Sequence, residues 1–88
     1  MLIGKVIGKI VSTRKEPKLS GAKLLVVQPL DLKMKPTGEP MVCIDSVEAG
    51  YGETVLVVQG SSARLVSHQG DNPVDAAIIG IIDSVDLN

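Results

Sequence analysis

The stretch Leu2-Ile3-Gly4-Lys5-Val6-Ile7-Gly8-Lys9-Ile10-Val11-Ser12-Thr13 opens the chain and decides its fold. Apolar residues and glycines occupy alternate positions from Leu2 to Ile10, and isoleucine or lysine stands between them. Alternation with a period of two is typical of a β-strand whose two faces have different surroundings. Glycines inside a strand weaken it, but they allow sharp bending and close backbone approach, as at the corners of small barrels. We therefore expect a long, bent strand over Leu2–Thr13.

The composition of the whole chain favours the same class of structure. Twelve Val, eight Ile and nine Leu make up one third of the 88 residues, whereas Phe and Trp are absent. β-branched side chains are stiff in helices and pack well on pleated surfaces, so this composition indicates an all-β protein. A chain of 9.2 kDa is one domain with a thin core.

Four further strands are expected, at Lys23–Gln28, Met41–Ser46, Thr54–Gln59 and Ile78–Val85. Pro29 should end the second strand because proline has no N–H for a sheet ladder. A short helix is predicted from Ser61 between the fourth and fifth strands, since serine is a good helix N-cap. Five short strands must close on themselves or leave edges exposed, which predicts a small, partly open, five-stranded OB-like β-barrel. The helix position departs from the usual OB connection.

Charge and apolar runs exclude several classes of partner. Nine Lys and Arg against ten Asp and Glu give a net charge of −1, which is not the basic footprint of a nucleic-acid binder. Tyr51 is the only aromatic residue, so base-stacking platforms are also missing. The longest apolar stretch, Ala76–Ile82, has seven residues, too few for a membrane span. With one cysteine and no recognisable signal segment, a cytoplasmic location is expected.

The sequence offers little for catalysis. Cys43 and His68 could in principle form a thiolate–imidazole pair, but Cys43 alternates with Val42 and Ile44 and is better explained as a small core residue. One Cys and one His also lack the ligand spacing of a structural zinc site. We expect no enzymatic activity, no cofactor and no metal.

The aliphatic residues exceed what a small monomer can bury. The first strand carries isoleucine and valine on its lysine-bearing face, and the last strand is apolar on both faces. This pattern predicts packing between subunits, and a head-to-tail contact between identical subunits closes into a ring. The candidate ring-interface residues are Ile3, Ile7, Val11, Ile79 and Ile81.

Five segments span nearly the whole chain in order: 6–15, 19–29, Asp45-Ser46-Val47-Glu48-Ala49-Gly50-Tyr51-Gly52-Glu53, Gly60-Ser61-Ser62-Ala63-Arg64 and 73–83. Together they resemble the EutN/CcmL family of bacterial microcompartment vertex proteins. Glu48 departs from the family pattern, which has glycine before Ala49-Gly50, so the conformation of that loop is in question.

The resemblance implies a structural shell protein in a single domain covering residues 1–88. Such proteins are small β-barrels that form homopentamers and fill the fivefold vertices of polyhedral shells, next to hexameric shell proteins. The solvated loops Arg14–Lys18 and Asp31–Pro40 are candidates for the contact with those hexamers, although ordinary surface loops are an equally good interpretation. The alternative is a stand-alone OB-like barrel that binds a small ligand or RNA. The resemblance does not identify the type of microcompartment or the enclosed pathway.

In a pentamer, Gly60-Ser61-Ser62-Ala63-Arg64 is a candidate for the fivefold axis. Small residues let five chains approach closely, and Gly60, Ser61, Ser62 and Arg64 would then line a pore that favours anions or is plugged. An ordinary helix start with a solvated Arg64 is an equally good interpretation.

Overall fold

The computed structural model describes residues 1–13, 17–19, 21–60, 63 and 75–88. In this part of the chain there are five strands and one 3₁₀ turn. They are β1 (Leu2–Ile10), η1 (Pro17–Leu19), β2 (Leu24–Leu30), β3 (Met41–Asp45), β4 (Thr54–Gln59) and β5 (Ala76–Ile81).

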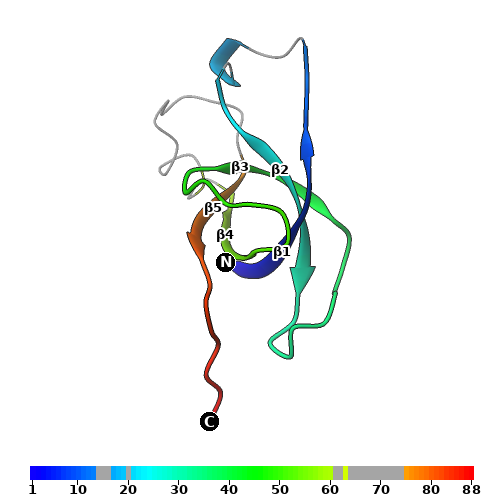
Figure 1. Ribbon diagram of the computed structural model, residues 1–88, viewed down its shortest axis with the longest axis vertical. Coiled ribbons are helices and arrows are strands. Elements are labelled where there is room, and N and C mark those ends of the chain that lie inside the picture. Colours follow the sequence, from blue (N-terminus) through cyan, green and yellow to red (C-terminus); the bar gives the residue numbers. More distant parts are fainter. Residues whose placement is uncertain (14–16, 20, 61–62, 64–74) are drawn as a thin grey trace.

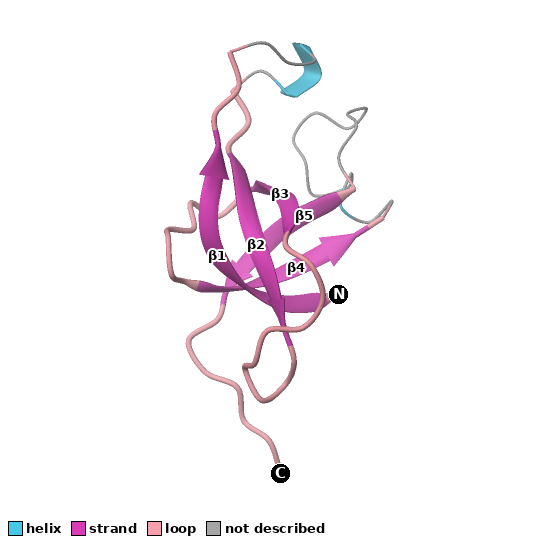
Figure 2. Cartoon of the chain, turned by 90° about the vertical axis from the view of Figure 1, so that its right-hand side faces the viewer, coloured by secondary structure: helices cyan, strands magenta, loops and turns pink. Residues whose placement is uncertain are grey.

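The five strands form a closed barrel in the order β1-β2-β3-β5-β4, and β4 pairs with β1 (Figures 1 and 2). The β3–β5 pair is parallel and the other four pairs are antiparallel. The prediction of an all-β, five-stranded barrel is confirmed, although the barrel is closed rather than partly open. Closure leaves no strand of the barrel without a neighbour on either side. Of the predicted helix from Ser61, only Ala63 lies within the described residues.

Small aliphatic side chains fill the barrel. Its largest fully buried side chains are Ile78, Val6, Val27, Val55, Val57 and Cys43. A five-stranded barrel has a narrow interior, which short β-branched side chains fill without any aromatic ring. The absence of Phe and Trp from the sequence is therefore consistent with the width of this core.

A β-bulge at Ile7 interrupts the alternation expected for β1. Val6 is paired with Val27 and Gly8 with Val26, so Ile7 has no partner across the β1–β2 ladder. An inserted residue exchanges the two faces of a strand beyond it. We expected Leu2, Val6 and Ile10 to lie on one face of β1. This expectation is wrong for Ile10, which lies beyond the bulge and is 42% exposed.

Three strands differ from the sequence prediction by two or more residues at an end. β1 ends at Ile10 rather than Thr13, and β5 runs over Ala76–Ile81 rather than Ile78–Val85. β2 continues through Pro29 to Leu30. β3 pairs only with Leu24–Val27 of β2, so the β2–β3 ladder ends before Pro29. Because Pro29 has no neighbour from β3, its missing N–H removes no hydrogen bond from that ladder.

A second apolar cluster lies outside the barrel. Val58 of β4 and Ala77 of β5 are buried there with Ala63, which comes from the segment between these strands. Leu19, Ile44 and Ile79 pack against this group. Ala77 is paired with both Val58 and Ile44, so a small side chain at this point lets Ala63 approach the sheet.

Candidate functional site

Cys43 is a core residue and not a reactive thiol. Its side chain is fully buried in β3, and burial, with the charge of Asp75 as a second cause, raises the pKa of the thiol to about 11. At neutral pH the group is therefore protonated and a poor nucleophile. His68 lies outside the described residues. Among the residues that are described, no group of three or more His, Cys, Asp or Glu side chains could hold a metal ion.

The connection from Asp45 to Glu53 closes one end of the barrel. The Asp45 side chain accepts hydrogen bonds from the backbone N–H groups of Val47 (3.0 Å) and Ala49 (2.8 Å). Lys23 Nζ lies 3.5 Å from Asp45 Oδ2 and donates to the carbonyl of Ala49 at 2.9 Å. Ala49 is fully buried under these contacts. The connection is thus a fixed part of the barrel, with Tyr51 82% exposed in its outer turn.

Glu48 has a φ of +57° in this connection. This is the left-handed conformation, which glycine adopts freely and which a residue with a Cβ adopts at a cost. The loop therefore keeps a backbone suited to glycine, although the sequence has glutamate there. The contacts of Asp45 and Lys23 on either side hold Glu48 in this conformation.

Ile3 lies in an apolar depression on the outside of the barrel. It is paired with Leu30 of β2 and with Leu56 of β4, and these three side chains form a row across three strands. With Met1, Leu2, Asp31 and Leu32 they line an open depression of about 520 Å³, which we call the N-terminal depression. Sequence reasoning identified Ile3 but missed Leu30 and Leu56, because only the strand register reveals that they are its neighbours.

Ile7 and Val11 are exposed at the surface of β1 and just beyond it. Ile7, the bulged residue, is 40% exposed, and Val11 is 79% exposed. Both are therefore available to a neighbouring subunit.

Ile79 and Ile81 differ from each other in their surroundings. Ile79 is also a bulged residue, between the pairs Val57–Ile78 and Leu56–Gly80, and it already packs against the second apolar cluster of its own subunit. Ile81 is 39% exposed at the end of β5. Ile3 and Ile79 thus belong to separate groups of side chains, so the five candidates do not form one patch.

Of the pore candidates, only Gly60 lies within the described residues. It is exposed, has a φ of +69° and donates its N–H to the carbonyl of Asp75 at 2.7 Å. This bond ties together the two ends of the segment between β4 and β5. Ser61, Ser62 and Arg64 are outside the described part of the chain.

The connection 31–40, between β2 and β3, is exposed but held in place. Asp31 Oδ1 accepts hydrogen bonds from the backbone N–H groups of Lys33 (2.8 Å) and Lys35 (3.0 Å). Gln28 Nε2 donates to the carbonyls of Thr37 and Gly38 at 3.4 and 3.2 Å. These contacts present two lysines on a fixed turn.

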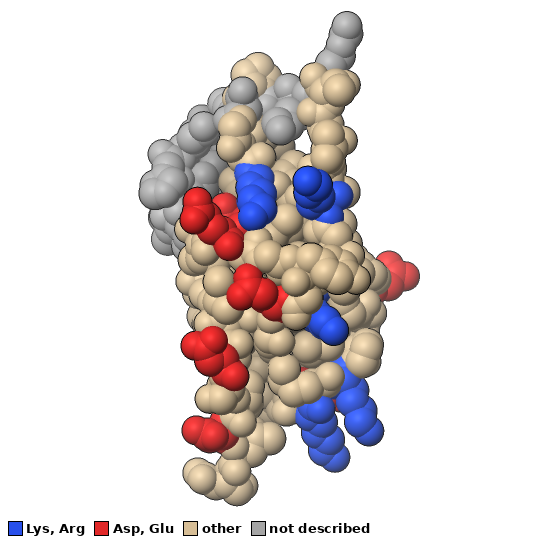
Figure 3. All heavy atoms as spheres, viewed as in Figure 1, with Lys and Arg blue, Asp and Glu red and all other residues tan. Residues whose placement is uncertain are grey.

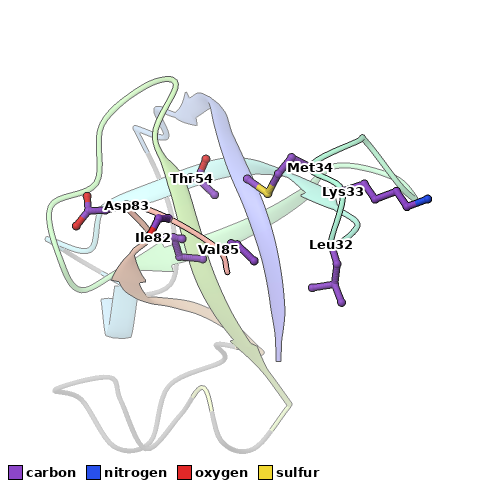
Figure 4. Close-up of a pocket in the computed structure, with 8 residues that line it drawn as sticks. Leu32, Lys33, Met34, Thr54, Ile82, Asp83 and Val85 are labelled. Atoms are coloured by element: carbon purple, nitrogen blue, oxygen red, sulfur yellow. The ribbon is translucent and has the colours of Figure 1, made fainter. Parts of the chain in front are cut away.

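Most acidic and basic groups at this end of the molecule lie on different sides. In Figure 3, basic atoms lie over the connection 31–40 and most acidic atoms lie along the side that carries the C-terminal segment, residues 82–88, although one acidic group lies on the opposite edge. The connection itself also contains Asp31 and Glu39. A second, smaller depression of about 200 Å³ separates these segments. Figure 4 shows Leu32, Lys33 and Met34 on one side of it and Ile82, Asp83 and Val85 on the other.

Comparison with known proteins identifies the family. A family model described as ethanolamine utilisation protein EutN/carboxysome matches residues 1–83. The shell vertex protein GrpN of Rhodospirillum rubrum is 50% identical over 86 residues, which are 98% of this chain and 97% of GrpN. The EutN vertex protein of Salmonella typhimurium is 45% identical over 85 residues, covering 97% and 86% of the two chains.

Solved structures agree with these relationships. The structure of CcmL from Gloeobacter violaceus has a TM-score of 0.94 at 44% identity and covers all of this chain and 91% of that chain. The structure described as GrpN pentameric microcompartment shell protein has a TM-score of 0.89 at 50% identity and covers 99% and 100% of the two chains. The relatives support a structural shell function and not the alternative of a stand-alone ligand-binding or RNA-binding barrel.

The predicted absence of enzymatic activity is confirmed by these relatives, which are structural proteins. Their location in a microcompartment shell supports the predicted location of this chain. The chain belongs to the EutN/CcmL family and is a structural vertex protein of a bacterial microcompartment shell.

Proposed function

We propose that five copies of this chain close into a ring, and that the ring occupies a fivefold corner of a polyhedral shell. The observation that carries this proposal is the similarity, along the whole chain, to a shell protein described as pentameric. The exposed aliphatic residues Ile7, Val11 and Leu32 give it physical support, because apolar surface on so small a domain is stabilised when a neighbour covers it.

The native mass in solution tests the ring. Five chains of 9.2 kDa have a mass of about 46 kDa. We expect this mass by light scattering at micromolar concentration, and a single species of one chain would contradict the proposal. Co-expression with hexameric tile proteins tests the corner: closed shells should form with this protein, and elongated or open assemblies should form without it.

The ring contact should include some of the predicted isoleucines. Burial of one such side chain contributes about 1.5–3 kcal/mol, and a ring of five repeats that contribution at each contact. Solvent still reaches part of the side chains of four candidates, Ile3, Ile7, Val11 and Ile81. Ile79, in contrast, packs against an apolar cluster of its own subunit. Ile81→Asp should therefore give folded monomers, checked by circular dichroism. A folded variant that keeps the mass of five chains would exclude Ile81 from the contact.

For the outer rim of the ring, we propose that the connection Asp31–Pro40 contacts hexameric shell proteins. Its backbone is fixed by Asp31 and Gln28, so binding would require little ordering, and Lys33 and Lys35 suit an acidic surface. Arg14–Lys18 remains a second candidate, for which the structure describes only Pro17 and the backbone of Lys18.

Charge reversal separates contact with hexamers from ring formation. Lys35→Glu should keep the mass of the ring but weaken its association with hexamers, most clearly at low salt. Lys9→Glu is the matched control, because Lys9 is an exposed lysine at the other end of the β1–β2 ladder. Equal association of the two variants with hexamers would contradict the assignment of the rim.

A pore lined by Gly60, Ser61, Ser62 and Arg64 remains a prediction. A structure of the assembled ring tests it directly. Small residues around the axis would support the prediction, and Ser61 and Ser62 on the outer rim would contradict it.

A further inference from the structure

A ring of identical subunits needs two different surfaces on each subunit, one for each neighbour. We propose that Leu87, in the C-terminal segment of one subunit, docks into the N-terminal depression of the next. This inference rests on the proposed ring. It assigns the two surfaces to an apolar depression on β1, β2 and β4 and to the segment that follows β5.

Within the described part of the chain, the N-terminal depression is an open and mainly apolar surface. Leu30, Ile3 and Leu56 form its floor as cross-strand neighbours. At its rim, Met1 is 79% exposed and Leu32 is 61% exposed. Concave apolar surface of this kind is favourable for an aliphatic side chain from another molecule, because both surfaces then leave water.

The C-terminal segment leaves the barrel and extends away from it (Figures 1 and 2). Ile82 still donates its N–H to the carbonyl of Thr54 at 2.8 Å. Val85 is half-buried and lines the second depression opposite Leu32 and Met34 of its own subunit, whereas Leu87 is 62% exposed. The segment is therefore held to β4 at Ile82, and Leu87 lies beyond this attachment.

Charges of opposite sign lie near the two surfaces. Asp83 and Asp86 lie in the C-terminal segment, and Lys33 follows Leu32, which lines the N-terminal depression. Asp31 is the charged residue that lines the depression itself, and its Oδ1 accepts the backbone N–H groups of Lys33 and Lys35, so its charge is partly satisfied within the connection. Opposite charges around an apolar contact favour one head-to-tail orientation over others.

Leu87→Asp tests the docking residue with little risk to the fold, because its side chain is exposed. We expect the native mass to fall from five chains towards one, with an unchanged circular dichroism spectrum. Leu32→Asp should have the same effect through the other surface. Tyr51→Asp is the matched control, since Tyr51 is exposed in the connection at the barrel end, and it should keep the mass of five chains.

These masses distinguish failure of the inference from failure of the ring. A parent protein of one-chain mass would overturn the proposed function itself. A parent ring that survives Leu87→Asp would overturn only the docking of Leu87. Dissociation by Val11→Asp but not by Leu87→Asp would likewise overturn it and place the contact just beyond the last residue of β1.

A cross-link then shows which subunit holds the segment. The variant carrying both Leu32→Cys and Leu87→Cys, oxidised as the assembled ring, should give a ladder of covalent multimers on a non-reducing gel. Cys43 does not interfere, because its side chain is fully buried. Bridged monomers would show that the segment folds onto its own subunit and would overturn the proposal, as would the absence of any new disulfide.

Discussion

Replacement of Gly4 by alanine tests whether the barrel is as tightly closed as the structure indicates. Gly4 is buried in β1, and it is paired with Pro29 of β2 and Val55 of β4. A Cβ at this position would overlap Cγ1 of Val27 and would lie 3.1 Å from the carbonyl oxygen of Gln28. Val27 is fully buried in the barrel core and the carbonyl belongs to the β2 backbone, so neither atom moves cheaply.

The expected cost follows from the packing of the core. One extra carbon in a well-packed interior costs about 1–3 kcal/mol, because neighbours leave their preferred rotamers or the backbone shifts. For a domain of this size, each kcal/mol lowers the melting temperature by about 4–8 °C. Gly4→Ala should therefore melt at least ~4 °C below the parent protein.

Gly8→Ala is the matched control in the same strand. A Cβ at Gly8 would lie 3.8 Å from Cβ of Val26, an ordinary contact, and Gly8 is not among the residues with positive φ. Alanine there should be neutral or stabilising by up to about 1 kcal/mol, since glycine loses more entropy on folding. Thermal melts by circular dichroism at one fixed protein concentration compare the three proteins, because assembly makes melting depend on concentration. Equal melting temperatures for the two variants would refute the argument from close packing.

Two further predictions concern Glu48 and Cys43. Glu48→Gly should stabilise the fold by about 0.5–1 kcal/mol, because the strain that a Cβ causes in the left-handed conformation costs more than the entropy that glycine adds to the unfolded chain. Glu48→Ala is the control, since alanine keeps the Cβ and the strain. Equal free energies of unfolding in urea for the alanine and glycine variants would contradict this reason. The pKa of Cys43 is raised from 9.0 to about 11, so its neutral thiol favours the fold below about pH 9, and this contribution is lost as the pH rises from about 9 to about 11. The free energy of unfolding should therefore fall more steeply over this range in the parent protein than in Cys43→Ala, and parallel pH profiles would exclude thiol ionisation as a cause.

The predicted strands show which parts of the fold a local sequence pattern can specify. Thr54–Gln59 matches β4 as predicted, and Met41–Ser46 differs from β3 by one residue. Alternating β-branched residues between glycine- and proline-containing turns are a local signal, which is why these strands were predictable. β5 was placed two residues late because Ala76 and Ala77 have low strand propensity. Their place in the sheet depends on contacts with β3 and β4 that are distant in sequence.

The sequence by itself determined the class of fold, the aliphatic core and the family. Composition and local alternation carry this information, and the quoted segments resemble the family without any knowledge of three-dimensional contacts. The isoleucines that suggest assembly could also be identified from the sequence, but the surfaces that they form could not.

Only the tertiary structure decided which residues share a surface. The bulges at Ile7 and Ile79 exchange strand faces, and the ladder register places Leu30 and Leu56 beside Ile3. Strand pairing joins residues far apart in the chain, and a shift of one residue moves every side chain to the opposite face. The N-terminal depression, the left-handed Glu48 and the path of the C-terminal segment all depend on that pairing, so local sequence pattern does not specify them.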